Sequence, residues 1–190
     1  MMGSFYTNIT LRTTDTGRVV SALRIAHRVA LVSAPKQGCI VVCDEATEEQ
    51  DLDVLRALTS LLSRECNCAA LGVMNHDDDV LLYFLADAGT VVDEYNSAPA
   101  YFDPDGDPDT PPSGGDPTIA ARLFGASHHT LARILSEPGT DDSFVFAMDR
   151  HRALAEALGT PTFCVGAGFT YLTEGEYPEG ADESTFSPAT

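Results

Sequence analysis

The residues best suited to chemistry lie in one polar run, Asn75-His76-Asp77-Asp78-Asp79, which separates two apolar stretches. Carboxylates beside an imidazole can hold a divalent cation or assist a histidine that acts as a general base. Asn and Asp are also the ordinary residues of tight turns, and successive side chains diverge, so that only some could share one ion. The run therefore predicts a turn, with a metal or acid–base site centred on His76 as the alternative.

A second acidic motif alternates Asp with other residues through positions 103–109. Read from Asp105, a calcium-binding EF-hand loop requires Gly at its sixth position and Glu at its twelfth. Thr110 and Asp116 stand at those positions, and four nearby prolines restrict how the chain could wrap an ion. We therefore expect a solvated acidic loop, with weak divalent-cation binding as the alternative, its candidate ligands being Asp105, Asp107 and Asp109.

The remaining reactive side chains form no complete catalytic constellation. Cys164 precedes Gly166 and Gly168, but a thiol nucleophile needs a base within reach, and the sequence does not place one. Cys66 and Cys68 form a C-x-C without a second pair, unlike a zinc ribbon or a C-x-x-C redox motif. Walker A, G-x-S-x-G and H-E-x-x-H motifs are absent from the sequence. We therefore expect no resident cofactor, and we favour a protein that is not an enzyme.

The charge of the chain is large and uneven. The 190 residues carry 11 Lys and Arg against 29 Asp and Glu, a formal net charge of −18. Residues 41–117 hold 18 of the acidic residues and only two of the basic ones. Such a field repels nucleic acid and anionic membranes and speeds encounter with basic proteins, although it also promotes solubility. The charge therefore excludes nucleic-acid and membrane partners and favours a basic protein partner.

The first 95 residues read as a regular α+β sequence. Helical spacing predicts helices over residues 16–26 and 47–64, the second opening on a capping box from Thr47 to Gln50. Apolar runs and alternation predict six strands, over residues 5–11, 29–33, 39–43, 69–74, 80–86 and 90–95. The first six elements follow the β-α-β-β-α-β order of ferredoxin-like folds, and two further strands extend the sheet. We expect a mostly antiparallel sheet with helices on one face.

The second half of the chain is less regular. Residues 96–117 form an acidic loop rich in Pro and Gly, which we expect to separate the sheet core, residues 1–95, from the C-terminal part of the chain. Residues 118–173 predict a small helical segment that packs on the core and ends in a glycine-interrupted strand over 163–172. Residues 174–190 predict a frayed acidic tail.

Together these patterns predict a non-catalytic binding module for a basic protein partner. An inhibitor that shields a basic enzyme from its substrate would be a special case. The predicted interaction residues are the acidic ones at the turn and in the last strand of the core, namely Asp77, Asp78, Asp79, Asp93 and Glu94. The alternative is a metal-dependent enzyme or metal-binding protein centred on the turn from His76 to Asp79. The sequence leaves the oligomeric state open.

The cellular compartment is predicted by what the sequence lacks. The first twelve residues have neither a basic region nor an apolar one, so we expect no secretory signal. The longest apolar run, residues 80–86, is far shorter than a membrane span. Five cysteines cannot all pair internally, which suits a reducing compartment. We therefore expect a soluble, cytoplasmic protein.

Overall fold

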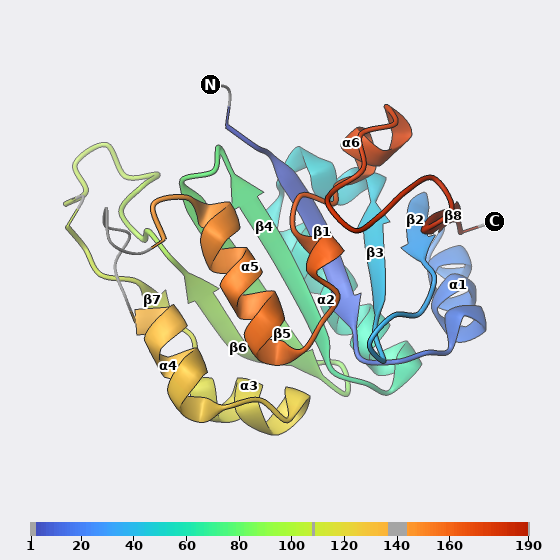
Figure 1. Cartoon of the computed structure of the whole chain (residues 1–190), viewed down its shortest axis with the longest axis horizontal. Coiled ribbons are helices and arrows are strands. Elements are labelled where there is room, and N and C mark those ends of the chain that lie inside the picture. Colours follow the sequence, from blue (N-terminus) through green and yellow to red (C-terminus); the bar gives the residue numbers. More distant parts are fainter. Residues whose placement is uncertain (1–2, 108, 137–143, 190) are drawn as a thin grey trace.

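An antiparallel sheet is the centre of the computed structural model, which describes residues 3–107, 109–136 and 144–189. Within them the strands are β1 (Tyr6–Leu11), β2 (Ala30–Ser33), β3 (Ile40–Asp44), β4 (Ala70–His76), β5 (Val80–Asp87), β6 (Thr90–Asn96), β7 (Ser113–Gly114) and β8 (Phe186–Pro188). Across the sheet they follow the order β7-β6-β5-β4-β1-β3-β2-β8, and each neighbouring pair is antiparallel. Figure 1 shows β1 and β4 side by side in the middle of the sheet.

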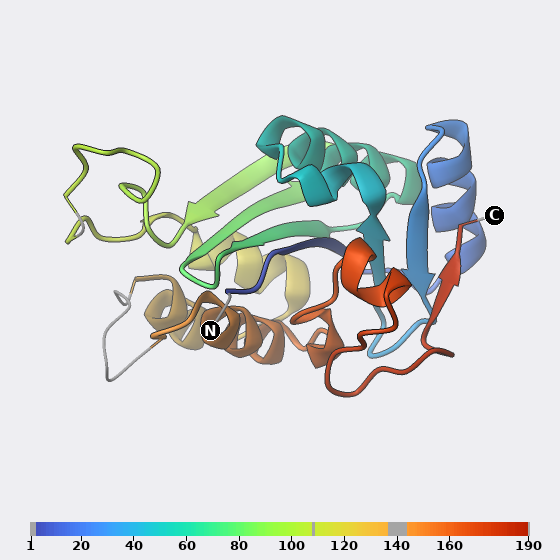
Figure 2. The same ribbon diagram turned by 90° about the horizontal axis from the view of Figure 1, so that it is seen from above.

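Helices cover both faces of this sheet (Figure 1, Figure 2). On one face lie α1 (Thr16–Ile25) and α2 (Leu52–Cys66), and on the other lie α3 (Pro117–Phe124), α4 (His128–Ser136) and α5 (Ala147–Leu158). This layering explains why β5 is apolar at successive positions, since both of its faces are covered by helices. Its even-numbered residues from Val80 to Phe84 join the core under α1 and α2, and its odd-numbered residues from Leu81 to Leu85 join the core under α3, α4 and α5.

The predicted α+β class is confirmed, and the strands and α-helices of residues 6–96 follow the predicted order. The predicted strands over residues 29–33 and 39–43 pair with each other as an antiparallel hairpin, with Leu31 of β2 opposite Cys43 of β3. The expectation of helices on one face holds for α1 and α2. The C-terminal helices pack on the opposite face, because the odd-numbered apolar side chains of β5 also need cover.

The start of α2 differs from the predicted capping box. Thr47 lies in a 3₁₀ helix, η1 (Glu45–Glu49), and its hydroxyl donates to the carbonyl of Asp44 instead of accepting from a helix amide. Gln50 then adopts a left-handed conformation, with φ of 58°, and ends η1. Asp51 caps α2 by accepting from two backbone amides of its first turn. The side chain of Gln50 is therefore available for another contact.

The predicted strand over residues 163–172 is wrong. That stretch forms η2 (Thr162–Cys164) and the short helix α6 (Phe169–Thr173). The tail is not frayed as expected, because β8 pairs with β2 at the edge of the sheet, with Phe186 opposite Ser33. Phe186 is buried and packs edge-to-face on Phe163, at 5.6 Å between ring centroids. The burial of Phe186 and the pairing of β8 with β2 thus hold part of a segment whose acidic, Pro-containing composition predicts a frayed tail.

The loop between β6 and β7 projects beyond the end of the sheet (Figure 2). Its described residues form turns, and β7 returns the chain to pair with β6. The loop carries two adjacent aromatic residues, Tyr101 and Phe102. In the part of the chain that the structure describes, no helix is long and apolar enough to cross a membrane.

Candidate functional site

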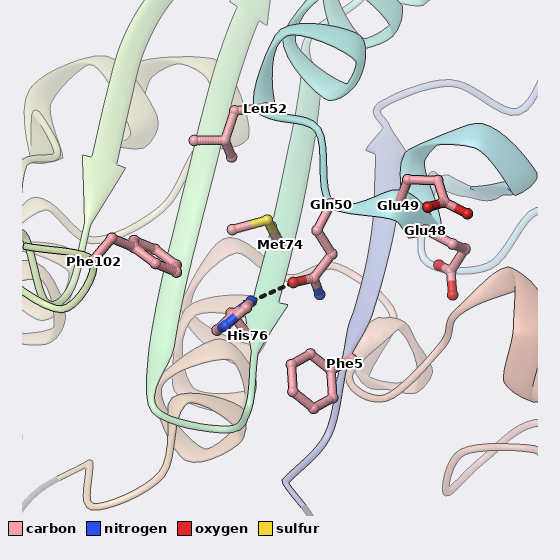
Figure 3. Close-up of a pocket in the computed structure, with 8 residues that line it drawn as sticks. All are labelled: Phe5, Glu48, Glu49, Gln50, Leu52, Met74, His76 and Phe102. Atoms are coloured by element: carbon pink, nitrogen blue, oxygen red, sulfur yellow. Dashed lines mark hydrogen bonds between the residues drawn. The ribbon is translucent and has the colours of Figure 1, made fainter.

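A pocket of about 560 Å³ lies where the end of β4 meets the start of α2 (Figure 3). Its walls come from the residue before β1, from η1 and the residue after η1, from α2, from β4 and from the projecting loop. We call it the His76 pocket, and it is lined by Phe5, Glu48, Glu49, Gln50, Leu52, Met74, His76 and Phe102. Residues from four separate parts of the sequence thus share one site.

Local backbone geometry explains how these side chains meet. Met74 and His76 are two residues apart on β4, so they point to the same face of the sheet, the one covered by α2. The left-handed turn at Gln50 directs its side chain back toward His76. Phe102 reaches the pocket from the loop after β6. The turn that separates η1 from α2 is therefore what completes this site.

A hydrogen-bond chain orients the imidazole of His76. Nε2 of Gln50 donates to the carbonyl of Asn75 at 2.9 Å, which turns the amide oxygen of Gln50 toward Nδ1 of His76. An amide oxygen can only accept, so Nδ1 carries the hydrogen of that bond. In the neutral ring Nε2 is then a hydrogen-bond acceptor, on the side of the imidazole away from Gln50 (Figure 3).

Three exposed aromatic rings surround His76. The rings of Phe5 and Phe102 each lie 5.0 Å from its imidazole centroid, and that of Tyr101 lies at 5.8 Å. All three meet the imidazole nearly edge-on, which is a favoured arrangement of aromatic pairs. Phe5 is 42% exposed, Tyr101 41% and Phe102 55%. A contiguous group of large apolar side chains this open to solvent makes the pocket a candidate contact surface.

Two carboxylates add negative charge to the pocket. Glu48 accepts from the backbone amides of Thr7 at 3.2 Å and Thr170 at 3.4 Å, whereas Glu49 is exposed. None of the ion pairs formed between described residues includes Glu48 or Glu49. The lining of the pocket contains neither Lys nor Arg. The site therefore combines aromatic rings with negative charge that its own residues do not neutralise.

The polar run after His76 forms a turn, as predicted from its composition. Asp77 and Asp78 both have positive φ, of 53° and 60°, in the tight connection between β4 and β5. Asp78 accepts from the backbone amide of Met148 at 2.9 Å and so caps the start of α5, although the two lie 70 residues apart. Asp79 accepts from the hydroxyl of Tyr101 at 3.2 Å. The carboxylates of Asp78 and Asp79 thus point to different neighbours, and Asp79 is the one that joins the aromatic group.

Substitution of Asp78 separates its capping role from its charge. Asp78→Ala removes the acceptor of the Met148 amide and is expected to lower the free energy of unfolding by about 1 kcal/mol. Burial, together with the carboxylates of Asp149 and Asp79, raises the pKa of Asp78, so the fold disfavours its charged form. Asp78→Asn keeps an accepting oxygen without that charge and is expected to be at least as stable as the wild type. Urea denaturation near neutral pH measures both variants, and equal losses would contradict a capping role.

The other two predicted interaction residues lie on β6 and already have partners. Asp93 accepts from the hydroxyl of Tyr83 at 2.7 Å and from the amide of Asp116 at 2.9 Å. Glu94 forms an exposed ion pair with Arg56 of α2. Successive residues of a strand point to opposite faces, so Asp93 and Glu94 do not share a surface with each other. The structure does not bring the five predicted residues together.

The alternative metal ligands are not assembled either. In residues 3–107, 109–136 and 144–189, no three His, Cys, Asp or Glu side chains converge as ligands would. Asp107 accepts from the amide of Asp109 at 2.9 Å and so closes a turn of the loop. Asp105 donates its own amide to Asp103 in the same manner. His76 belongs to no such group among these residues, so the structure gives no support to a metal site centred on it.

No protein-family model, curated protein or solved structure matches the chain. Family membership therefore assigns no residue a role here. The features of the molecule that bear on its function are the His76 pocket, the charge of that pocket and the acidity of the whole chain.

Cys164, whose surroundings the sequence leaves open, lies beside a histidine. Its Sγ is 3.5 Å from Nε2 of His151, and Nδ1 of His151 is 2.8 Å from the hydroxyl of Tyr6. Burial lowers the pKa of His151 to about 3 and raises the pKa of Cys164 to about 12, so both groups are neutral. A nucleophilic thiolate needs a lowered pKa and access to substrate. The trio instead holds α5 and η2 against β1.

Sequence patterns do not reveal most of the pocket. They place Phe5 in a strand, Gln50 in a capping box and Phe102 in a solvated loop. The one usable signal is the pair of Tyr101 and Phe102 inside a loop otherwise made of Pro, Gly and Asp. Adjacent large aromatics in such a segment have no local core to bury them, which is a reason to expect a contact surface.

Proposed function

We propose that this protein is a non-catalytic binding module for a basic protein partner, and that the His76 pocket is its anchoring site. The observation that carries the proposal is the exposed aromatic group around His76 beside the unneutralised Glu48 and Glu49. The acidity of residues 41–117 supports the same partner. An inhibitor that covers a basic enzyme is one form such a module would take.

The two parts of the site suit different stages of binding. Aromatic side chains dominate the energetic centre of protein interfaces because they bury large area at a small cost in conformational entropy. Negative charge around them speeds encounter with a positive surface and disfavours acidic competitors. A binding module needs both properties. Ser, Thr, Cys and Lys, which commonly serve as activated nucleophiles in hydrolytic and transfer enzymes, are absent from the lining of the pocket.

The test is a pull-down with the tagged protein from extract of its own cells, at ionic strengths of about 0.05 M and about 0.5 M. The partner, identified by mass spectrometry, is then purified and its Kd measured by calorimetry. We expect a basic protein whose affinity falls with salt and falls at least about tenfold in Phe102→Ala, as the loss of an interface anchor does.

Phe146→Ala is the matched control for this experiment. Phe146 is 52% exposed, close to the 55% of Phe102, but it lies before α5 and not at the pocket. Its substitution is expected to leave the Kd unchanged. Equal effects of the two substitutions, or an affinity that does not change with salt, would overturn the proposal.

A further inference from the structure

We propose that the His76 pocket holds an arginine side chain of the partner. This inference rests on the proposed function and names the group that the anchoring site recognises. It is drawn from three properties of the pocket: the polarity of its hydrogen-bonding groups, the arrangement of its rings and its charge.

The polar groups of the pocket call for a hydrogen-bond donor. Gln50 takes the hydrogen of His76 Nδ1, which leaves Nε2 of the neutral imidazole as an acceptor. The carboxylates of Glu48 and Glu49 are acceptors only. A quaternary ammonium ion has no hydrogen to donate to these groups, and an anion would meet two negative charges. A ligand that carries both positive charge and N–H groups can donate to Nε2 of His76 and is attracted by both carboxylates, of which Glu48 already accepts from the amides of Thr7 and Thr170.

The rings favour a flat cation. Phe5 and Phe102 lie on either side of His76 (Figure 3), at interplanar angles of 83° and 71° to the imidazole, and both are open to solvent. A guanidinium group stacks on aromatic faces and remains charged at every physiological pH. Its five N–H groups lie in one plane, so it can donate to an imidazole while its face covers a ring. The ammonium of lysine is a compact and strongly hydrated charge. It has no flat face to stack on an aromatic ring, so it suits these rings less well than a guanidinium group.

The positive end of the α2 dipole does not reverse this preference. The first residue of α2, Leu52, lines the pocket, and a helix N-terminus attracts anions. However, the Asp51 carboxylate already accepts from the amides of Asp53 and Val54, at 2.9 Å and 3.2 Å. Two of the amides that would hold an anion are therefore already occupied by the chain itself.

The test compares two peptides of equal charge, hexa-arginine and hexa-lysine, by titration calorimetry at about 0.05 M ionic strength. We expect the wild type to bind hexa-arginine at least about tenfold more tightly, a difference of about 1.4 kcal/mol. His76→Phe keeps an aromatic ring but removes the Nε2 acceptor, and it is expected to reduce the preference to less than about threefold. His129→Phe, on the exposed surface of α4, is the matched control and should retain the full preference.

A second variant keeps the test decisive if His76→Phe does not fold. Phe102→Leu retains an apolar side chain at an exposed position but removes the π face, so it too should reduce the preference for arginine. If both peptides bind with equal affinity to the wild type, the arginine pocket is wrong while a basic partner still stands. If neither peptide binds at low salt, the proposed function fails as well.

Discussion

Arg28→Met is expected to lower the free energy of unfolding by about 3 kcal/mol, because it leaves a buried carboxylate without its partner. Asp44, at the end of β3, is only 1% exposed. Arg28 binds it through two hydrogen bonds: Nε donates to Oδ2 at 2.9 Å, and Nη2 donates to Oδ1. This contact raises the pKa of Arg28. Asp44 also accepts from the amide of Thr47 and so caps η1, the helix that carries Glu48 and Glu49 to the His76 pocket.

Two further variants test the reason for that loss. Arg64→Met breaks an exposed pair, with side chains 65% and 46% accessible, and is expected to cost less than about 1 kcal/mol. Asp44→Asn in the Arg28→Met background removes the stranded charge and should recover part of the stability. Midpoints of urea denaturation measure each variant. Losses of equal size for Arg28→Met and Arg64→Met would show that the Asp44 charge is not held by Arg28.

Lowering the pH is expected to reduce the free energy of unfolding of the wild type, because His151 is protonated in the unfolded chain. His151→Gln should remove this part of the pH dependence. In the folded protein burial lowers the pKa of this histidine to about 3, whereas the unfolded chain has the ordinary value of 6.5. Between these values the unfolded state binds a proton that the folded state does not. Stability from this group is therefore present above the ordinary pKa and is lost as the pH falls. The slope is about 1.4 kcal/mol per pH unit.

The informative quantity is the difference in unfolding free energy between wild type and variant. Near neutral pH, His151→Gln is expected to be less stable by about 1–3 kcal/mol, since Tyr6 and Cys164 lose a buried partner. That gap should narrow as the pH falls from about 6.5 to about 4. The many surface carboxylates affect both proteins alike and cancel. His129→Gln, at an exposed position of α4, should show a gap that does not change with pH. A constant gap for His151→Gln would mean that the folded protein protonates this residue.

The sequence by itself determined the features that depend on neighbouring residues. Alternation and apolar runs located the strands of residues 6–96 to within a few positions. Successive side chains of a strand point to opposite faces, so the burial of each face determines every second residue of the sequence. Gly125 and Gly159 follow the last residues of α3 and α5 and adopt the left-handed conformation there, which is the usual role of a glycine after a helical stretch. The composition of residues 75–79 predicted a turn for the same local reason. The excess of acidic residues over 41–117 needed no structure at all.

Only the tertiary structure decided which distant residues meet. Asp78 caps α5 across 70 residues, and Cys164 meets His151 although one lies in η2 and the other in α5. The stretch over 163–172 reads as a strand, yet it forms η2 and α6, and the residues that pair with β2 at this edge of the sheet are those of β8. The His76 pocket exists because the order of strands and the turn at Gln50 bring its walls to one place. Such contacts produce no periodic pattern in the amino-acid sequence. Each of them depends on how separate helices and strands pack together, and not on the spacing of residues within a single helix or strand.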